Sequence, residues 1–152
     1  MSLGLYLHIP YCFSKCRYCD FYSHPGERGV PDAYVDALLR ELLGEGEYWV
    51  RPPYGLMTEA EAAALSVPLV NWSVDTEDWK SKDADKILDI IYRQVSDGDI
   101  VLLHDRYQNT VDAVLRAVPH LQEQGYVFVT VSELLALKGV TPESGVTYHS
   151  VK

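Results

Sequence analysis

The most regular feature of the chain is an alternation of short apolar runs with longer stretches whose apolar residues recur at helical spacing. The short runs have the length of buried strands, and each is followed or ended by a proline or a polar residue. They predict strands at residues 3–10, 48–50, 68–74, 100–103 and 126–131. The run 100–103 contains four consecutive aliphatic residues, which is typical of a parallel strand covered on both faces.

The stretches between these runs predict helices, because their apolar residues fall three or four positions apart and capping residues stand at their ends. Helices are expected to begin at Asp32, Thr58, Asp83 and Thr110, with a closing helical turn over 132–137. Pro119 predicts a kink in the fourth helix. The polar tail from Lys138 onward contains glycine and proline, so we expect it to be loosely held.

Alternating strands and helices predict an α/β fold with right-handed crossovers. We expect an incomplete (β/α) barrel of roughly five mostly parallel strands flanked by helices, fewer than the eight strands of a closed barrel. Such a sheet has an open edge. Because unpaired edge strands recruit partners, we also expect a homodimer or swapped oligomer that completes the sheet.

Composition narrows the choice of partners. A chain of 152 residues that is 47% hydrophobic can bury one core and is short for two ordinary domains, so one compact unit is expected. Its net charge of -9 disfavours binding to nucleic acid or to an anionic membrane. No apolar run approaches the roughly 20 residues of a membrane span, and no export leader is recognised, so we expect a cytoplasmic protein.

The three cysteines, Cys12, Cys16 and Cys19, form the pattern C-x3-C-x2-C directly after the first predicted strand. An odd number packed so closely suits metal binding in a reducing compartment better than a disulfide framework. Three thiolates can hold three irons of a [4Fe–4S] cluster and leave the fourth iron open. The alternatives are three free thiols on an exposed loop, or zinc with His8 or His24 as the fourth ligand.

The stretch GLYLHIPYCFSKCRYCDFYS resembles the start of radical SAM enzymes of the oxygen-independent coproporphyrinogen III oxidase-like family. The Y-x-H-I-P-x-C lead, the cysteine spacing and the C-D-F ending carry this resemblance, which covers residues 1–46. It implies that the open iron binds S-adenosylmethionine and reduces it to a 5′-deoxyadenosyl radical. The likeness stops near Glu45, and the glycine-rich segment with which the family holds the S-adenosylmethionine amino group does not follow.

Three further motifs stand in order at the ends of successive predicted strands. They are Arg51-Pro52-Pro53-Tyr54-Gly55, then Trp72 with Asp75, Asp78 and Trp79, then Leu102-Leu103-His104-Asp105. Three motifs in this order are far more specific than one. With the ending G-Y-x-F-V-T-V-S-E-L-L, they make residues 47–152 similar to the C-terminal half of polysaccharide deacetylases of the NodB-homology type.

This second resemblance implies metal-assisted removal of an N- or O-acetyl group from a glycan. His104 matches the general acid that protonates the leaving amine, a task that suits histidine because its ordinary pKa lies near neutral. Asp75 matches the carboxylate that tunes this histidine, and Arg51 matches the residue that orients the catalytic base. Each of these roles is implied by the resemblance.

For substrate binding, the resemblance implies that the backbone N–H of Tyr54 stabilises the oxyanion. Leu102 and Trp79 match the apolar wall around the acetyl methyl group. Structural roles stay open beside these: Arg51 paired with an acid, Trp72 and Trp79 as core aromatics, and His104 bonded to Asp75 or Asp105.

The family's metal and base motifs have no counterpart in the sequence. T-F-D-D-G is absent, and the five histidines, at 8, 24, 104, 120 and 149, include no H-x3-H pair. We therefore expect no bound divalent metal and no turnover. Three functions stay open: a deacetylase-derived fold with little or no activity on acetylated glycans, a radical SAM fragment that assembles a cluster, and a non-catalytic hybrid.

Overall fold

The computed structural model describes residues 48–152 and two short stretches, 11–12 and 24–25. The chain divides into two compact units, Met1–Gly46 and Glu47–Lys152, and each is described by itself. In the first unit, β1 (Tyr11–Cys12) pairs in parallel with β2 (His24–Pro25). The backbone at Cys12 therefore belongs to a short ladder, where the sequence predicted a loop. The predicted strand 3–10 and the helix expected from Asp32 lie outside the described residues.

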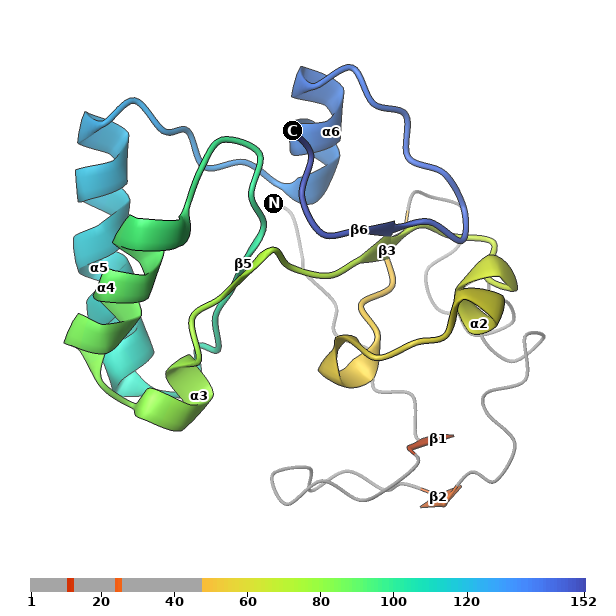
Figure 1. Ribbon diagram of the computed structural model, residues 1–152, viewed down its shortest axis with the longest axis horizontal. Coiled ribbons are helices and arrows are strands. Elements are labelled where there is room, and N and C mark those ends of the chain that lie inside the picture. The colour runs from red at the N-terminus through yellow and green to blue at the C-terminus, as the bar shows by residue number, and fades with distance from the viewer. Residues whose placement is uncertain (1–10, 13–23, 26–47) are drawn as a thin grey trace, which may run out of the picture. The chain divides into compact units, whose positions relative to one another are not determined.

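The second unit is an α/β structure of parallel strands and helices, as the alternating pattern predicts (Figure 1). Its strands are β3 (Leu69–Val70), β4 (Val74–Asp75), β5 (Val101–Leu102) and β6 (Thr147–Tyr148). β3 pairs with β6 and β4 pairs with β5, both in parallel. A parallel bridge from Val50 to Leu69 adds the predicted segment 48–50. Since β3 and β4 follow each other closely, the stretch 69–75 contributes a strand to both ladders.

Six helical segments accompany these strands within residues 48–152. They are η1 (Pro53–Gly55), α2 (Glu59–Ala63), α3 (Asp78–Ser81), α4 (Ala84–Gln94), α5 (Gln108–Glu123) and α6 (Val131–Leu137). Pro119 lies inside α5 without ending it. None of the helices in the described part of the chain has the length and apolar character needed to cross a membrane.

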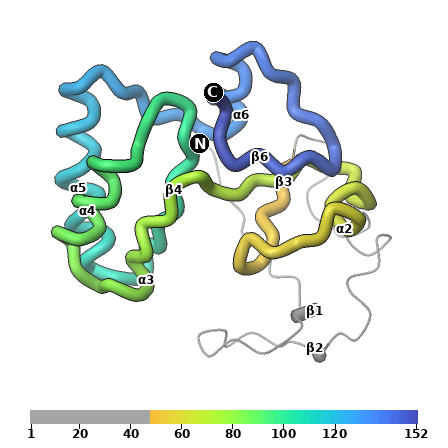
Figure 2. The backbone as a smooth tube through the Cα atoms, viewed as in Figure 1, coloured from red at the N-terminus to blue at the C-terminus, as the bar shows by residue number. Residues whose placement is uncertain are grey.

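The main core lies between α4 and α5, which run side by side (Figure 2). α4 contributes Ile87, Leu88 and Ile91, and α5 contributes Ala113, Ala117 and Leu121. These are the apolar positions whose helical spacing predicted both elements. The two alanines present little bulk, which lets the helix backbones approach closely. Burial of this stripe explains why these two helices are the longest in the described region.

The predicted strand 126–131 does not form. The chain leaves α5 after Glu123 and reaches α6 at Val131, and the residues between have no ladder partner among the described residues. Val131 begins α6 instead, because Thr130 accepts a hydrogen bond from the Glu133 N–H and Glu133 caps Thr130 in return. A strand needs a neighbour, and apolar alternation alone does not supply one.

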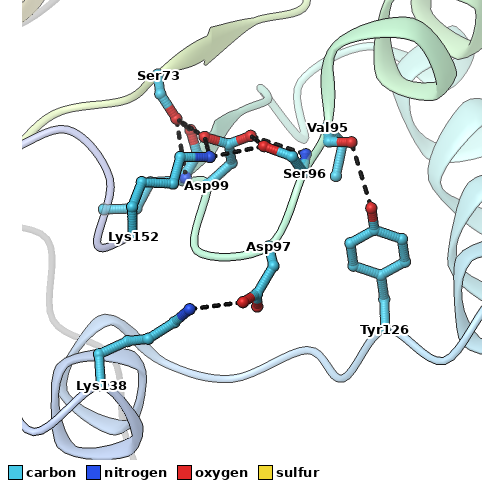
Figure 3. Close-up of polar contacts among 9 residues, drawn as sticks. Ser73, Val95, Ser96, Asp97, Asp99, Tyr126, Lys138 and Lys152 are labelled. Atoms are coloured by element: carbon cyan, nitrogen blue, oxygen red, sulfur yellow. Dashed lines mark hydrogen bonds and ion pairs between the residues drawn. The ribbon is translucent and has the colours of Figure 1, made fainter.

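The tail from Lys138 is held firmly, contrary to the sequence-based expectation. β6 lies within it, and the Val151 side chain is buried. The Lys152 ammonium contacts the Asp99 carboxylate at 2.6 Å, and the Lys138 ammonium contacts Asp97 (Figure 3). The Val151 N–H also donates to the Gly98 carbonyl at 2.8 Å. These contacts fasten the tail to the turn that follows α4.

Candidate active site

The site is built where two parallel strands end. β4 and β5 pair in register, with Val74 opposite Val101 and Asp75 opposite Leu102. Because the carboxyl ends of parallel strands meet at one edge, the residues that follow them are brought together. His104 comes shortly after β5, and Asp78, the first residue of α3, comes shortly after β4.

Asp78 holds His104 at two atoms. One carboxylate oxygen lies 2.8 Å from the His104 Nδ1, and the other accepts the His104 backbone N–H at 2.6 Å. The Thr110 hydroxyl donates to the second oxygen at 2.9 Å. Thr110 was predicted to cap a helix, but α5 begins two residues earlier, at Gln108, and Thr110 is buried inside it. The carboxylate therefore joins α3, the end of β5 and α5.

The charge state of Asp78 follows from these contacts. Its side chain is fully buried, and burial by itself raises the pKa of a carboxyl. The hydrogen bonds from the His104 ring, the His104 N–H and Thr110 outweigh burial and place the pKa of Asp78 below its ordinary value. The ionised carboxylate can only accept, so the Nδ1 of His104 carries the proton. The opposite nitrogen, Nε2, is left as the reactive position of a partly exposed ring.

Asp75, which the resemblance matched to this role, lies elsewhere. Its carboxylate accepts the Glu77 backbone N–H at 2.9 Å, and no hydrogen bond or ion pair joins it to His104. Glu77 has a left-handed backbone with φ of 49°, which turns the chain sharply before α3. This turn brings Asp78, rather than Asp75 or Asp105, to the histidine. The two carboxylates stand in one motif, and their spacing alone does not distinguish them.

Arg51 and Trp72 form a second part of the candidate site. The Arg51 guanidinium lies over the Trp72 ring, 5.0 Å from its centroid, and no acid among the described residues pairs with it. Gly55 also packs closely against this tryptophan, since a Cβ there would come within 2.7 Å of the Trp72 ring. Tyr54, with φ of 56°, makes the turn before Gly55 and presents half of its side chain to solvent.

The two apolar residues assigned to the acetyl wall differ in exposure. Leu102 is buried, and its carbonyl accepts the Thr76 hydroxyl at 2.8 Å. Trp79 directly follows Asp78 in α3 and is 50% exposed, so it is not a core aromatic. A flat, half-exposed aromatic ring is suited to contact with the apolar face of a sugar.

No group of three or more metal-ligating side chains gathers anywhere in the part of the chain that the structure describes. Taken from residues 48–152 alone, the donors around His104 are too few to hold a divalent ion. Cys16 and Cys19 lie outside the described residues, and of Cys12 the backbone alone is described, so the cluster stays a prediction.

A pocket of about 370 Å³ lies apart from the Asp78–His104 pair. Its walls come from the segment around η1 and α2, from Asn71 and from the tail around β6. His104 does not line it. The pocket therefore gives no support for the chemistry considered at the ends of β4 and β5.

Several known proteins similar to this chain are named as deacetylases. The peptidoglycan-N-acetylglucosamine deacetylase PgdA of Listeria monocytogenes is 39% identical over 89 residues, which cover 59% of this chain and 19% of that protein. The peptidoglycan-N-acetylmuramic acid deacetylase PdaC of Bacillus subtilis is 35% identical over 101 residues, covering 66% of this chain and 22% of that protein. The chain thus spans about a fifth of these relatives. No family model matches it.

A solved structure agrees with this likeness. T48 deacetylase, solved with substrate, superposes with a TM-score of 0.68 and 30% identity, covering 84% of this chain and 66% of that one.

Proposed function

Most of this chain belongs to the polysaccharide deacetylase family, and we propose that residues 48–152 carry the general-acid part of a site for acetylated glycans. The Asp78–His104 pair carries this proposal. The carboxylate holds the proton on Nδ1 and fixes the ring, so Nε2 faces the reaction as the proton-transfer position. The step that this geometry serves begins when Nε2 also takes up a proton, which gives an imidazolium stabilised by the ionised Asp78 carboxylate. Nε2 then passes that proton to the leaving amine, and the ring returns to its neutral form with the proton on Nδ1.

Substrate binding is proposed to involve Trp79. Trp79 follows Asp78 in α3 and its ring is half-exposed, and sugar rings pack on such aromatic surfaces through their C–H faces. The named relatives act, by their names, on peptidoglycan amino sugars, so an N-acetylated glycan is the proposed substrate class.

We further propose that this 152-residue chain does not hydrolyse such glycans unaided. The described residues assemble no divalent metal site, and the sequence contains neither motif that supplies the family's base and metal ligands. A general acid without an activated water leaves the largest part of the barrier in place.

Two measurements test this function. Titration of chitin oligosaccharides should perturb the indole signal of Trp79, and Trp79→Ala should weaken binding, whereas Tyr92→Ala, which removes an exposed aromatic from α4, should not. Equal weakening by both variants, or none by Trp79→Ala, would contradict the glycan site.

Acetate release should be assayed with added zinc or cobalt on N-acetylated oligosaccharides. The expected result is no release above that of His104→Ala. Metal-dependent release that His104→Ala abolishes would show that this chain is a working hydrolase and would overturn the proposed inactivity.

The cysteine motif is a separate proposal, in which three thiolates hold a [4Fe–4S] cluster. Anaerobic reconstitution with iron and sulfide should then produce a broad visible absorbance that Cys16→Ala reduces. A colourless product would contradict it.

A further inference from the structure

The short helix α3 is strained at both of its ends. Glu77, the residue before it, has φ of 49°, and Lys82, the residue after it, has φ of 47°. Residues with a side chain rarely adopt this left-handed conformation, and the surrounding structure must offset its cost. A helix of four residues is also too short to be stable by itself. Contacts from other parts of the chain must therefore hold α3 in place.

Two consecutive residues of α5 bind the two ends of α3 (Figure 1). At its start, the Thr110 hydroxyl donates to the Asp78 carboxylate at 2.9 Å. At its end, the Asn109 side-chain amide donates to the Lys82 carbonyl at 2.6 Å. Carbonyl groups at the end of a helix have no partner within the helix, so Asn109 supplies one from outside. Asn109 and Thr110 are here called the α5 clamp.

The α5 clamp stands on a firm base. Thr110 is buried, and the alanines that follow it along α5, Ala113 and Ala117, belong to the core formed with α4. The Lys82 ammonium also lies 5.2 Å from the centroid of the Tyr107 ring, directly before α5. The first turn of α5 is thus fixed by packing and can transmit that fixed position to α3.

Thr110 also determines which oxygen of Asp78 reaches the histidine ring. Oδ2 accepts from both the Thr110 hydroxyl and the His104 backbone N–H. Both of these hydrogen bonds would have to break before the carboxylate could rotate. Oδ1 therefore stays directed at the His104 Nδ1, 2.8 Å away.

We propose that Asn109 and Thr110 are positioning residues for the Asp78–His104 pair. Thr110 orients the Asp78 carboxylate, Asn109 fixes the far end of α3, and the place of the proton on the His104 ring then depends on the first turn of α5. This inference rests on the proton-transfer role proposed above for His104. Trp79, which follows Asp78 in α3, is placed by the same two contacts.

Nitrogen chemical shifts of the His104 ring, with the solvent exchange of its Nδ1 proton, test the α5 clamp without any turnover. Thr110→Val keeps the shape but removes the hydroxyl, so the Nδ1 proton should exchange at least about tenfold faster, because a hydrogen bond to a charged group is lost. Thr110→Ser keeps a hydroxyl and should restore the wild-type rate. Asn109→Ala should speed the exchange by about threefold and shift the indole signal of Trp79.

Gln108→Ala is the matched control. Gln108 is the neighbour of the clamp in α5, but its side chain donates to Asp112 and does not contact α3. Its removal should leave the His104 and Trp79 signals unchanged. Circular dichroism shows whether each variant is folded, and Asn109→Ala decides the matter if Thr110→Val does not fold. Wild-type exchange in Thr110→Val, no rescue by Thr110→Ser, or equal changes in Gln108→Ala would each overturn the proposal.

The glycan site and the α5 clamp can fail separately. If Trp79→Ala leaves glycan binding intact while Thr110→Val alters the His104 ring as expected, the glycan site is wrong and the clamp is supported. If glycan binding needs Trp79 but neither Thr110→Val nor Asn109→Ala changes the His104 signals, the clamp alone is wrong.

Discussion

The Asp78 carboxylate accepts from His104 twice, from the ring at 2.8 Å and from the backbone N–H at 2.6 Å. The second contact fixes the backbone from which the ring projects, and the first fixes the ring itself. One buried acid thus sets both the position and the tautomer of the histidine. This gives the Asp78–His104 pair a rigidity that a contact with the ring alone would lack.

Asp78→Asn should lower the free energy of unfolding by about 2 kcal/mol, because a buried acceptor of three donors becomes an amide that cannot accept from all of them. Chemical denaturation measures this loss, and nitrogen chemical shifts of the His104 ring report the change of tautomer. Asp75→Asn is the control. It alters a single backbone hydrogen bond in the same motif and should leave the His104 ring signals in place.

The position of His104 could be predicted from sequence, whereas its partner could not. A histidine directly after a run of four aliphatic residues indicates a strand end, and that is where it lies. Whether Asp75 or Asp78 reaches the histidine depends on the left-handed backbone at Glu77. Glutamate rarely adopts this conformation, so the sequence does not predict the turn. The third hydrogen bond to Asp78 comes from Thr110 and depends on how α5 packs. From the sequence, Thr110 was predicted to cap the helix instead.

The secondary structure shows the same contrast: elements set by local sequence were predicted, and elements set by distant partners were not. α4 and α5 were predicted because their apolar periodicity is contained within each helix. The prediction of a strand at 126–131 was wrong, and β6 was not predicted. Both errors have one cause: whether a segment forms a strand depends on which other segment lies beside it in the fold. β6 is two residues in a polar tail, and its partner, β3, lies far earlier in the chain. No pattern within the tail announces that pairing.

Gly98→Ala should be strongly destabilising, by more than about 2 kcal/mol. Gly98 has φ of +84°, and a Cβ there would come within 1.9 Å of the Val151 carbonyl oxygen. Gly125 has a similar φ of +91°, but a Cβ there would meet no atom within 4 Å, so Gly125→Ala isolates the backbone strain of about 1 kcal/mol. Thermal unfolding of both variants separates the two causes. Equal losses would mean that the approach of Val151 to the turn contributes nothing.

Asp99 should make the fold sensitive to acid. Burial raises its pKa, but the Lys152 ammonium and hydrogen bonds from Ser96 and Ser73 lower the pKa to about 2, from an ordinary value of 3.8. Because the folded-state pKa is the lower one, this stabilisation is present above about pH 4 and is lost as the pH falls towards 2. It amounts to roughly 2 kcal/mol at neutral pH.

Asp99→Asn should therefore reduce the free energy of unfolding at neutral pH, and the difference from wild type should shrink towards pH 2. Urea denaturation across this range measures it. Asp97→Asn, which removes the exposed partner of Lys138, should change the denaturation midpoint much less, because solvent screens that pair. A pH-independent deficit in Asp99→Asn would contradict the linkage.

Leu135→Ala should destabilise the protein by about 3 kcal/mol, because its side chain is fully buried at the centre of α6 and its removal leaves a cavity. Leu137, two residues later, is mostly exposed, and Leu137→Ala should be within about 0.5 kcal/mol of wild type. Chemical denaturation of the two variants compares them directly. Similar small losses would mean that α6 is not a stable part of the second unit.

The stretch 69–75 gives β3 to one ladder and β4 to the other, and this determines how the second unit can come apart. A local opening that frees β3 from β6 pulls on residues that also hold β4 against β5, and the reverse is equally true. The two ladders are therefore expected to open in a single cooperative event, with amides at Leu69 and Val74 exchanging at closely similar rates. The end of β5 that carries His104 would lose its alignment in that same event. Changes that loosen the attachment of β6 are therefore expected to disorder the Asp78–His104 pair as well.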